Sequence, residues 1–279
     1  MYKVIADSSN EIDQAFLERY PVEIVPFKLY VDGNEYIDDE NLNVDDFVNA
    51  MVSSSSLPKS ACPSPNDFMA HFDGDADEIY VVTISANLSG TYNSAVLAKN
   101  IYESEHPGEK FIHIFDSLGA ASSETLVTRM IHEVKKEVMD PQKVVEIVER
   151  YIDETHVYFI SESLDNLIKN GRISKWKGMI ASTLKILPIM GADENGEIKL
   201  IEKVRTSNKA YLRLVEILQE EIHKNGKKIV AITHVGNYER ASQIEEALRN
   251  TPGVEELFNI KCAGLSSLYA DHKGIIVAL

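Results

Sequence analysis

An apolar run that ends in a hydroxyl-rich loop constrains the fold of this chain more than any other stretch. Residues 79–84 read Ile-Tyr-Val-Val-Thr-Ile, which predicts a buried strand, and the polar segment 85–95 follows at once. Val96, Leu97 and Ile101 then recur at helical spacing. The pattern therefore predicts a strand, a loop and a helix, with Ser89 as the N-cap of the helix.

The same transition recurs at two other predicted strands. Apolar runs near residues 5 and 113 end in Asp7-Ser8 and Asp116-Ser117. Strands that alternate with helices imply right-handed crossovers and a parallel sheet, whose carboxyl ends share one edge and form the usual ligand crevice. We therefore expect Asp7, Ser8, Ser89, Asp116 and Ser117 to approach one another.

The loop at 85–95 has two interpretations. Unpaired backbone N–H groups and the positive end of the helix dipole would favour a small anion, and Gly90 would let it approach the backbone closely. Alternatively, Ser89 and Thr91 only satisfy the first turn of their own helix. The convergence of three strand ends favours the binding site.

Composition and charge narrow the class of protein. The 279 residues are 44% apolar, and 28 basic against 44 acidic side chains give a net charge of −16, which opposes binding to nucleic acid or an anionic membrane. Cys62 and Cys262 form no metal-binding or disulfide pattern. No apolar run has transmembrane length and no signal peptide is evident, so we expect a cytoplasmic protein without integral membrane association.

The patterns divide the chain into two α/β parts. Residues 1–158 predict an N-terminal domain with a mainly parallel sheet flanked by helices, in which 22–30 form one strand. Residues 159–279 predict an α+β domain with a mixed or antiparallel sheet, a helix at 178–186 and a hairpin at 189–204. The Ser- and Pro-rich segment 53–65 is either a flexible surface loop or a ligand loop.

Few sequence features indicate catalysis. No nucleophile elbow, P-loop, dinucleotide fingerprint or zinc motif is present, and no metal site is expected. His234 and His272 are the histidines most expected to face a cleft. Arg172, Lys175 and Lys177 form a local positive cluster, which is either a solvated helix end or a contact for a phosphate or an acidic partner. Neutral hydroxyls suit binding of an anion better than catalysis.

An ordered set of motifs resembles the DegV family, which includes the fatty-acid-binding subunits of bacterial fatty acid kinase. The resemblance covers essentially the whole chain. The motifs that carry it are Asp7-Ser8-Ser9, Ser60-Ala61-Cys62-Pro63-Ser64 in place of the family's Thr-Ser-Gln-Pro-Ser, Leu88-Ser89-Gly90-Thr91-Tyr92, Asp116-Ser117, Asn170-Gly171-Arg172-Ile173-Ser174 and Leu187-Pro188-Ile189.

The resemblance implies a carrier rather than an enzyme. It implies a long-chain fatty acid buried between two domains as the ligand, no cofactor, and an ATP-dependent kinase subunit that converts the bound acid to an acyl phosphate. The family's carboxylate-binding hydroxyls correspond to Ser60 and Ser89, and Arg172 with Lys175 would face the kinase. The candidate ligand-binding residues are Ser8, Ser60, Ser89, Gly90, Thr91, Asp116, Ser117 and His272.

Two departures from the family pattern bear on the site. Ala61 and Cys62 replace a serine and a glutamine, which makes the expected pocket less polar. An ungapped alignment from the C-terminus puts Tyr269, not His272, at the family's histidine, so either residue remains a candidate for the carboxylate. The alternative function is a phosphotransferase or hydrolase that acts on a small polar anion, with Asp7 or Asp116 as the base.

Overall fold

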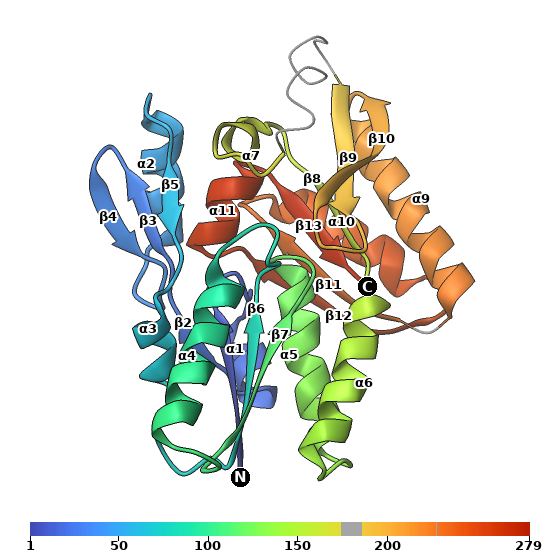
Figure 1. Cartoon of the computed structure of the whole chain (residues 1–279). Coiled ribbons are helices and arrows are strands. Elements are labelled where there is room, and N and C mark those ends of the chain that lie inside the picture. The colour runs from blue at the N-terminus through green and yellow to red at the C-terminus, as the bar shows by residue number, and fades with distance from the viewer. Residues whose placement is uncertain (174–185, 227) are drawn as a thin grey trace.

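A computed structural model describes residues 1–173, 186–226 and 228–279 (Figure 1). Its first sheet has four parallel strands in the order β2-β1-β6-β7, as the sequence predicts. We call the part of the molecule around it the parallel lobe. The strands are β1 (Tyr2–Asp7), β2 (Glu23–Val25), β6 (Glu78–Thr83) and β7 (Phe111–Asp116).

Helices cover both faces of the parallel sheet because its strands are apolar on both sides. Val4 and Ala6 pack against α5 and α6, whereas Ile5 between them packs against α3 and α4. The chain between these strands also contains a short helix, α1. The bounds are α1 (Gln14–Arg19), α3 (Pro65–Met69), α4 (Thr91–Glu105), α5 (Ser122–Lys135) and α6 (Pro141–Asp153).

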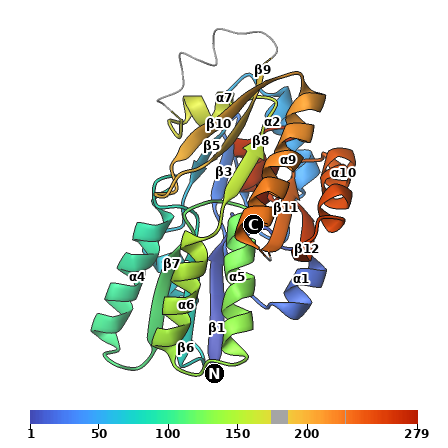
Figure 2. The ribbon, with the colours of Figure 1, turned by 90° about the vertical axis from the view of Figure 1, so that its right-hand side faces the viewer.

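The second sheet is mixed, as expected for the C-terminal part. Its order is β10-β9-β8-β13-β11-β12, in which only β11 and β12 pair in parallel. We call the part around it the mixed lobe, which occupies the upper half of Figures 1 and 2. The strands are β8 (Val157–Ile160), β9 (Ile186–Ala192), β10 (Ile198–Arg205), β11 (Lys228–His234), β12 (Val254–Lys261) and β13 (Ile275–Ala278).

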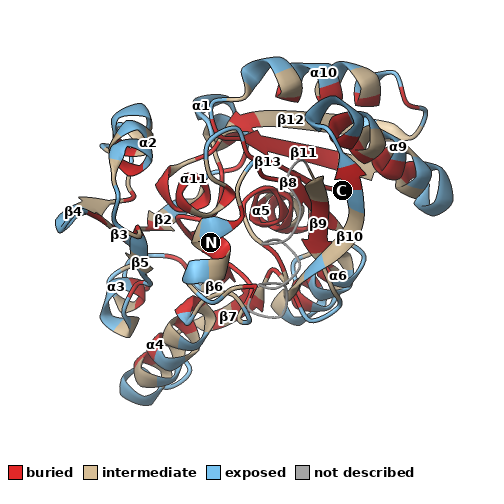
Figure 3. Ribbon diagram, turned by 90° about the horizontal axis from the view of Figure 1, so that it is seen from above, coloured by how far each residue is buried: buried red, intermediate tan, exposed pale blue. Residues whose placement is uncertain are grey.

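The two faces of the mixed sheet have different partners. Tyr158 and Ile160 of β8 pack against α9 and α10, whereas Val157 and Phe159 face α5, α7 and α11. Helix α5 contacts β1 and β6 as well as β11 and β13, and Figure 3 shows it at the centre of the molecule. The remaining helices are α7 (Asp165–Lys169), α9 (Ser207–Asn225), α10 (Tyr238–Arg249) and α11 (Gly264–Ala270).

A third sheet corrects two expectations. The predicted single strand at 22–30 is wrong, because the chain divides at Pro26, which has no N–H to donate: β2 joins the parallel sheet and β3 (Lys28–Val31) joins an antiparallel one. In that sheet β3 pairs with β4 (Asn34–Ile37) and β5 (Lys59–Ala61). Part of the Ser- and Pro-rich segment is therefore an edge strand, and α2 (Val44–Ser53) leads into it.

Two further expectations concern element boundaries. The helix expected at 178–186 falls outside the described residues except for Ile186, which begins β9. The proposed boundary between residues 158 and 159 falls inside β8, a strand of the mixed sheet.

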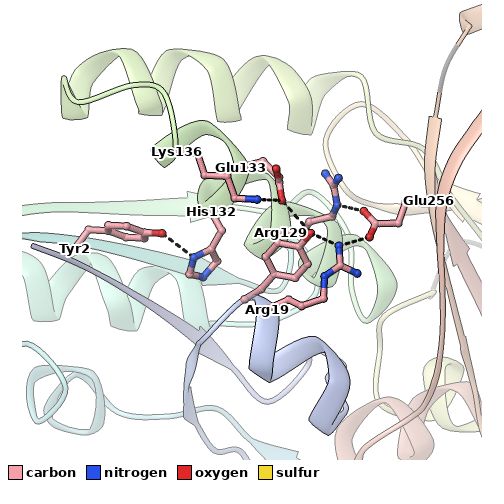
Figure 4. A network of polar contacts seen from close by, with 8 residues as sticks. Tyr2, Arg19, Arg129, His132, Glu133, Lys136 and Glu256 are labelled. Carbon is pink, nitrogen blue, oxygen red and sulfur yellow. Dashed lines mark hydrogen bonds and ion pairs between the residues drawn. The ribbon is translucent and has the colours of Figure 1, made fainter.

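A polar network joins the two lobes (Figure 4). Glu256 of β12 accepts from Arg19 of α1, with Nη2 2.5 Å from Oε1, and from Arg129 of α5, with Nε 2.6 Å from Oε2. The side chains of Arg129 and Glu256 are only 14% and 20% exposed. The contact therefore fixes α1 and α5 against the edge of the mixed sheet.

Candidate functional site

An apolar cavity lies between the carboxyl edge of the parallel sheet and one face of the mixed sheet. It encloses about 800 Å³ between atoms, counting solvent at its mouth, of which about 90 Å³ can hold the centre of a water molecule. The parallel lobe contributes Ile84, Leu88, Gly119 and Ala120, and the mixed lobe contributes Val157, Phe159, Leu167, Gly191, Ala192, Gly196, Ile198, Leu265, Ala270 and Ile276.

Polar side chains gather at one part of this wall. Ser60 of β5 and Tyr269 of α11 are hydrogen-bonded through their hydroxyls at 2.9 Å. The guanidinium carbon of Arg172 lies 5.2 Å from the centre of the Tyr269 ring, and its Nε donates to Leu88 O at 3.2 Å. Among the described lining residues, Arg172 alone is charged. Three distant segments thus bring hydroxyls and one cation together.

Ser89 presents another hydroxyl to the cavity, but it is not the predicted N-cap. Helix α4 begins at Thr91 with Gly90 as its N-cap. The Ser89 hydroxyl lies 2.8 Å from the Thr91 hydroxyl and accepts from Thr91 N at 3.3 Å. Because Ser89 is outside the helix, its side chain both supports the first turn and lines the cavity.

The expectation of unpaired amides in this loop is wrong for most of its residues. Ala86 N donates to the Asp116 carboxylate, and the amides of Leu88 and Ser89 donate to Ser85 O. A buried loop satisfies its own backbone in this way. Burial raises the pKa of Asp116, and backbone hydrogen bonds oppose that shift. Hydroxyls, rather than free amides, are therefore the groups this loop offers to a ligand.

The three strand ends do meet, although few of their side chains reach the cavity. Asp7 Oδ2 accepts from Ile84 N at 2.9 Å, and Ser117 N donates to Thr83 O at 3.1 Å. The Ser8 hydroxyl donates to Asp38 at 2.7 Å. The predicted residues that line the cavity are Ser60, Ser89 and Arg172, and those that lie behind or beside it are Ser8, Gly90, Thr91, Asp116 and Ser117.

The C-terminal candidates are separated by the end of α11. Tyr269 lines the cavity, whereas His272 lies in two surface grooves beside α2. Between them Asp271 ends the helix with a φ of 60°, which turns the chain outward. His234 is buried against Tyr238, and burial lowers its pKa. Lys175 lies outside the described residues.

Sequence reasoning missed a group of buried acids behind the cavity. Asp38 accepts from Gly264 N at 2.7 Å and Leu265 N at 2.9 Å, and Glu11 accepts from Ala263 N at 2.6 Å. These carboxylates hold the start of α11, which carries Leu265, Ser266 and Tyr269 into the cavity wall. Burial raises the pKa of Asp38 to about 6 and that of Glu11 to about 8.

The described residues form neither a metal-binding cluster nor a membrane-spanning helix. No cluster of three or more His, Cys, Asp or Glu side chains in these ranges is arranged to hold a metal ion. Among the helices formed by these residues, none has the length and apolar character needed to cross a bilayer.

The fold and the cavity define a class: two-lobed α/β proteins with an apolar cavity whose wall carries hydroxyls and an arginine. A family model described as "Uncharacterised protein, DegV family" matches residues 1–275. A DegV domain-containing protein of Streptococcus pneumoniae is 33% identical over 278 residues, which are 99% of this chain and 98% of that protein. The chain belongs to the DegV family, as its motifs predict.

Solved structures of family members have the same architecture. The DegV family protein of Ruminococcus gnavus, refined with vaccenic acid, is 40% identical with a TM-score of 0.94, over 100% of this chain and 99% of that chain. The fatty acid kinase B3 protein of Streptococcus pneumoniae, loaded with linoleic acid, is 31% identical with a TM-score of 0.88, over 100% of this chain and 98% of that chain.

Proposed function

We propose that this protein binds one long-chain fatty acid, with its alkyl chain in the cavity and its carboxylate on the hydroxyls of Ser60 and Ser89. The main support for the proposal is the lining of the cavity. Most of the wall is apolar, and hydroxyls and one arginine lie together in one region of it. A buried methylene contributes about 0.8 kcal/mol, so a chain of about sixteen carbons offers roughly 12 kcal/mol before association costs.

The ligands of two relatives support this proposal. Vaccenic acid in the R. gnavus protein and linoleic acid in the S. pneumoniae protein are both long-chain acids. Tyr269 bonds to Ser60 and lines the cavity, so it is the C-terminal residue that completes the carboxylate site in this proposal.

We further propose that the protein presents the fatty acid to an ATP-dependent kinase subunit in the cytoplasm. The name of the S. pneumoniae relative supports such a partner. Arg172, which lines the cavity and is partly buried, would act with Lys175 as the contact.

 The Arg172 side chain is held in place by its hydrogen bond to Leu88 O and by its contact with the Tyr269 ring.

The alternative, a phosphotransferase or hydrolase, has less support. Its candidate bases, Asp7 and Asp116, do not line the cavity, and both accept hydrogen bonds from backbone amides. The wall of the cavity is also too apolar to hold a small polar anion over most of its length.

A displacement assay on delipidated protein tests the proposal. A fluorescent long-chain fatty acid is bound first, and oleate, inorganic phosphate and a sugar phosphate are then added separately. We expect oleate to displace the probe and the two phosphates to leave it bound. Failure of both the probe and oleate to bind, or turnover of the sugar phosphate by the isolated chain, would contradict the proposal.

The kinase step is tested with a fatty acid kinase subunit and ATP. Loaded protein should yield an acyl phosphate, which hydroxylamine captures as a hydroxamate. We expect Arg172→Ala to lower the rate of this reaction by a larger factor than it lowers the affinity for oleate. Equal factors would contradict the assignment of Arg172 to the kinase contact.

A further inference from the structure

Four carboxyl groups are buried together behind the cavity. Asp7 and Glu124 are 0% exposed, Glu11 is 1% exposed and Asp38 is 3% exposed. Electrostatic contacts connect Asp7 with Asp38 and Glu124 with both Asp7 and Glu11. In the part of the chain that the structure describes, no lysine or arginine pairs with any of the four. Since burying several like charges without a counter-ion is very costly, at least one of these groups is a neutral acid.

The hydrogen-bond donors around each group identify the neutral one. Asp38 accepts from one hydroxyl and two backbone amides, and Asp7 accepts from two backbone amides. Glu11 accepts from one backbone amide and also interacts with the Ser266 hydroxyl. Neither oxygen of Glu124 has a donor in good hydrogen-bond geometry, and the Ser9 hydroxyl interacts with it more weakly. A buried carboxylate stays ionised only where donors stabilise its charge. Because Glu124 has the fewest donors of the four, it is the group best suited to hold a proton.

The partner of that proton is Asp7. The carboxyl groups of Asp7 and Glu124 lie in side-chain hydrogen-bonding contact. Two carboxylates cannot bond to each other, because neither has a hydrogen to donate. A protonated Glu124, in contrast, donates to Asp7 and satisfies both side chains.

We propose that Glu124 carries a proton that it donates to Asp7, and that this acid pair positions the residues that bind the head group of the fatty acid. Asp7 accepts from Ile84 N and from Ser9 N, each at 2.9 Å. Ile84 and Ser9 both line the cavity, and Ile84 leads into the loop that carries Ser89. Glu124 is thus a positioning residue that acts through Asp7, and this inference rests on the proposed function.

The arrangement makes binding depend on pH. Burial and the neighbouring acids raise the pKa of Glu124 well above its ordinary value, and burial raises the pKa of Asp7 to about 7. When Glu124 loses its proton, two negative charges face each other and Asp7 is pushed away from the Ile84 amide. The other titratable groups that interact with the pair are Asp38 and Glu11, and the Cys262 thiol in turn lies near those two acids.

Glu124→Gln tests the proposal, because the glutamine amide keeps the shape and donates to Asp7 at every pH. The dissociation constant for oleate is measured from pH 6 to pH 9 in both proteins, and their ratio cancels the ionisation of oleate itself. At pH 6 we expect the dissociation constants of the two proteins to agree within about twofold. At pH 9 we expect wild type to bind oleate about tenfold more weakly than Glu124→Gln does. Glu105→Gln, at the exposed end of α4, should follow wild type.

The outcomes separate this inference from the proposed function. If wild type and Glu124→Gln show the same pH dependence, the acid pair does not position the site, although the protein still binds fatty acid. If neither protein binds oleate at any pH, the proposed function fails. Should Glu124→Gln not fold, Asp7→Asn gives a second test: its oxygen can accept from Ile84 N, it loses the hydrogen bond from Ser9 N, and it has no charge to oppose Glu124, so binding should be weaker at every pH but the pH dependence should again be lost.

Discussion

Ser89 is the residue whose hydroxyl the proposed function needs most. It lines the cavity, and among the described residues its hydroxyl is hydrogen-bonded only to Thr91. A hydrogen bond to a charged group contributes about 1.5–3 kcal/mol, so Ser89→Ala should weaken oleate binding by roughly tenfold or more. Calorimetric titration of delipidated protein measures this effect. Ser104→Ala, on the exposed end of α4, should bind as wild type does, and an equal loss in both variants would contradict the assignment.

The buried acids predict how stability depends on pH. Burial raises the pKa of Asp38, Asp7 and Glu11 to about 6, 7 and 8. Because these values exceed those of the unfolded chain, the stability that each group contributes is complete below about pH 4 and is lost as the pH rises through its folded value. The midpoint of thermal unfolding should therefore decrease as the pH rises from about 4 to about 8, and level off above that.

Glu11→Gln provides the comparison for that measurement. It should reduce the fall in the unfolding midpoint, because an amide does not ionise, whereas Glu18→Gln on the exposed face of α1 should leave the fall unchanged. A midpoint that rises with pH over this range would show that the buried acids are ionised and compensated.

The site residues that sequence could predict are those that belong to local motifs. Ser60 and Ser89 stand in hydroxyl-rich loops after predicted elements, and Arg172 stands in a positive cluster. Glu11 and Glu124 give no such signal, because they look like any of the 44 acidic residues until long-range packing buries them. Burial of a polar side chain is a property of the assembled lobes and not of its neighbours in sequence.

At the scale of elements, apolar periodicity predicted the long strands and missed the short edge strand β5. β6 and β7 are strongly patterned and lie where expected. β5 is three residues long, and it forms because β3 offers it a partner. The strand predicted at 22–30 divides because Pro26 supplies no N–H, and the two halves then pair with different sheets.

The turn between β9 and β10 is the element that most directly closes the cavity. Asn87 Nδ2 donates to Asn195 O at 2.7 Å, and the Ser85 hydroxyl donates to Gly196 O at 3.0 Å. Gly196 has a φ of 73°, and a Cβ there would lie 2.4 Å from the Ser85 hydroxyl and 2.9 Å from Leu118 Cα. The turn of the mixed lobe therefore fits against the parallel lobe only with glycine at this position.

Gly196→Ala should lower the free energy of unfolding by about 1–3 kcal/mol and weaken oleate binding, because both the backbone conformation and the contact with Ser85 are disturbed. Chemical denaturation and calorimetry measure the two effects. Gly33→Ala is the matched control: its φ is 79°, but nothing lies within 4 Å of the added Cβ. Equal losses in both variants would mean that backbone strain alone, and not closure of the cavity, explains the result.

At the scale of the whole molecule, the sequence predicted two α/β parts but not how they share elements. Helix α5 lies in the N-terminal half of the sequence and contacts both sheets. The contacts that join the lobes involve residues far apart in the chain, such as Arg129 and Glu256, and charge pairs of this kind leave no local pattern. The two α/β parts could be predicted from the alternation of strands and helices. The interface between the lobes could not, because it depends on how their surfaces fit together in three dimensions.

Glu256→Gln should destabilise the protein by about 1–3 kcal/mol, because Arg129 would keep a buried charge with a weaker partner. Chemical denaturation measures the change. Glu216→Gln is the control, since Glu216 pairs with Arg213 at the surface with 61% of its side chain exposed. That exposed pair should contribute less than about 1 kcal/mol. A larger loss in the control would contradict the role given to the network between the lobes.

Native mass spectrometry of freshly purified protein tests the central claim most directly. We expect a species heavier than the bare chain by the mass of one long-chain fatty acid, which organic extraction removes and added oleate restores. A bare chain that takes up neither oleate nor palmitate would contradict it.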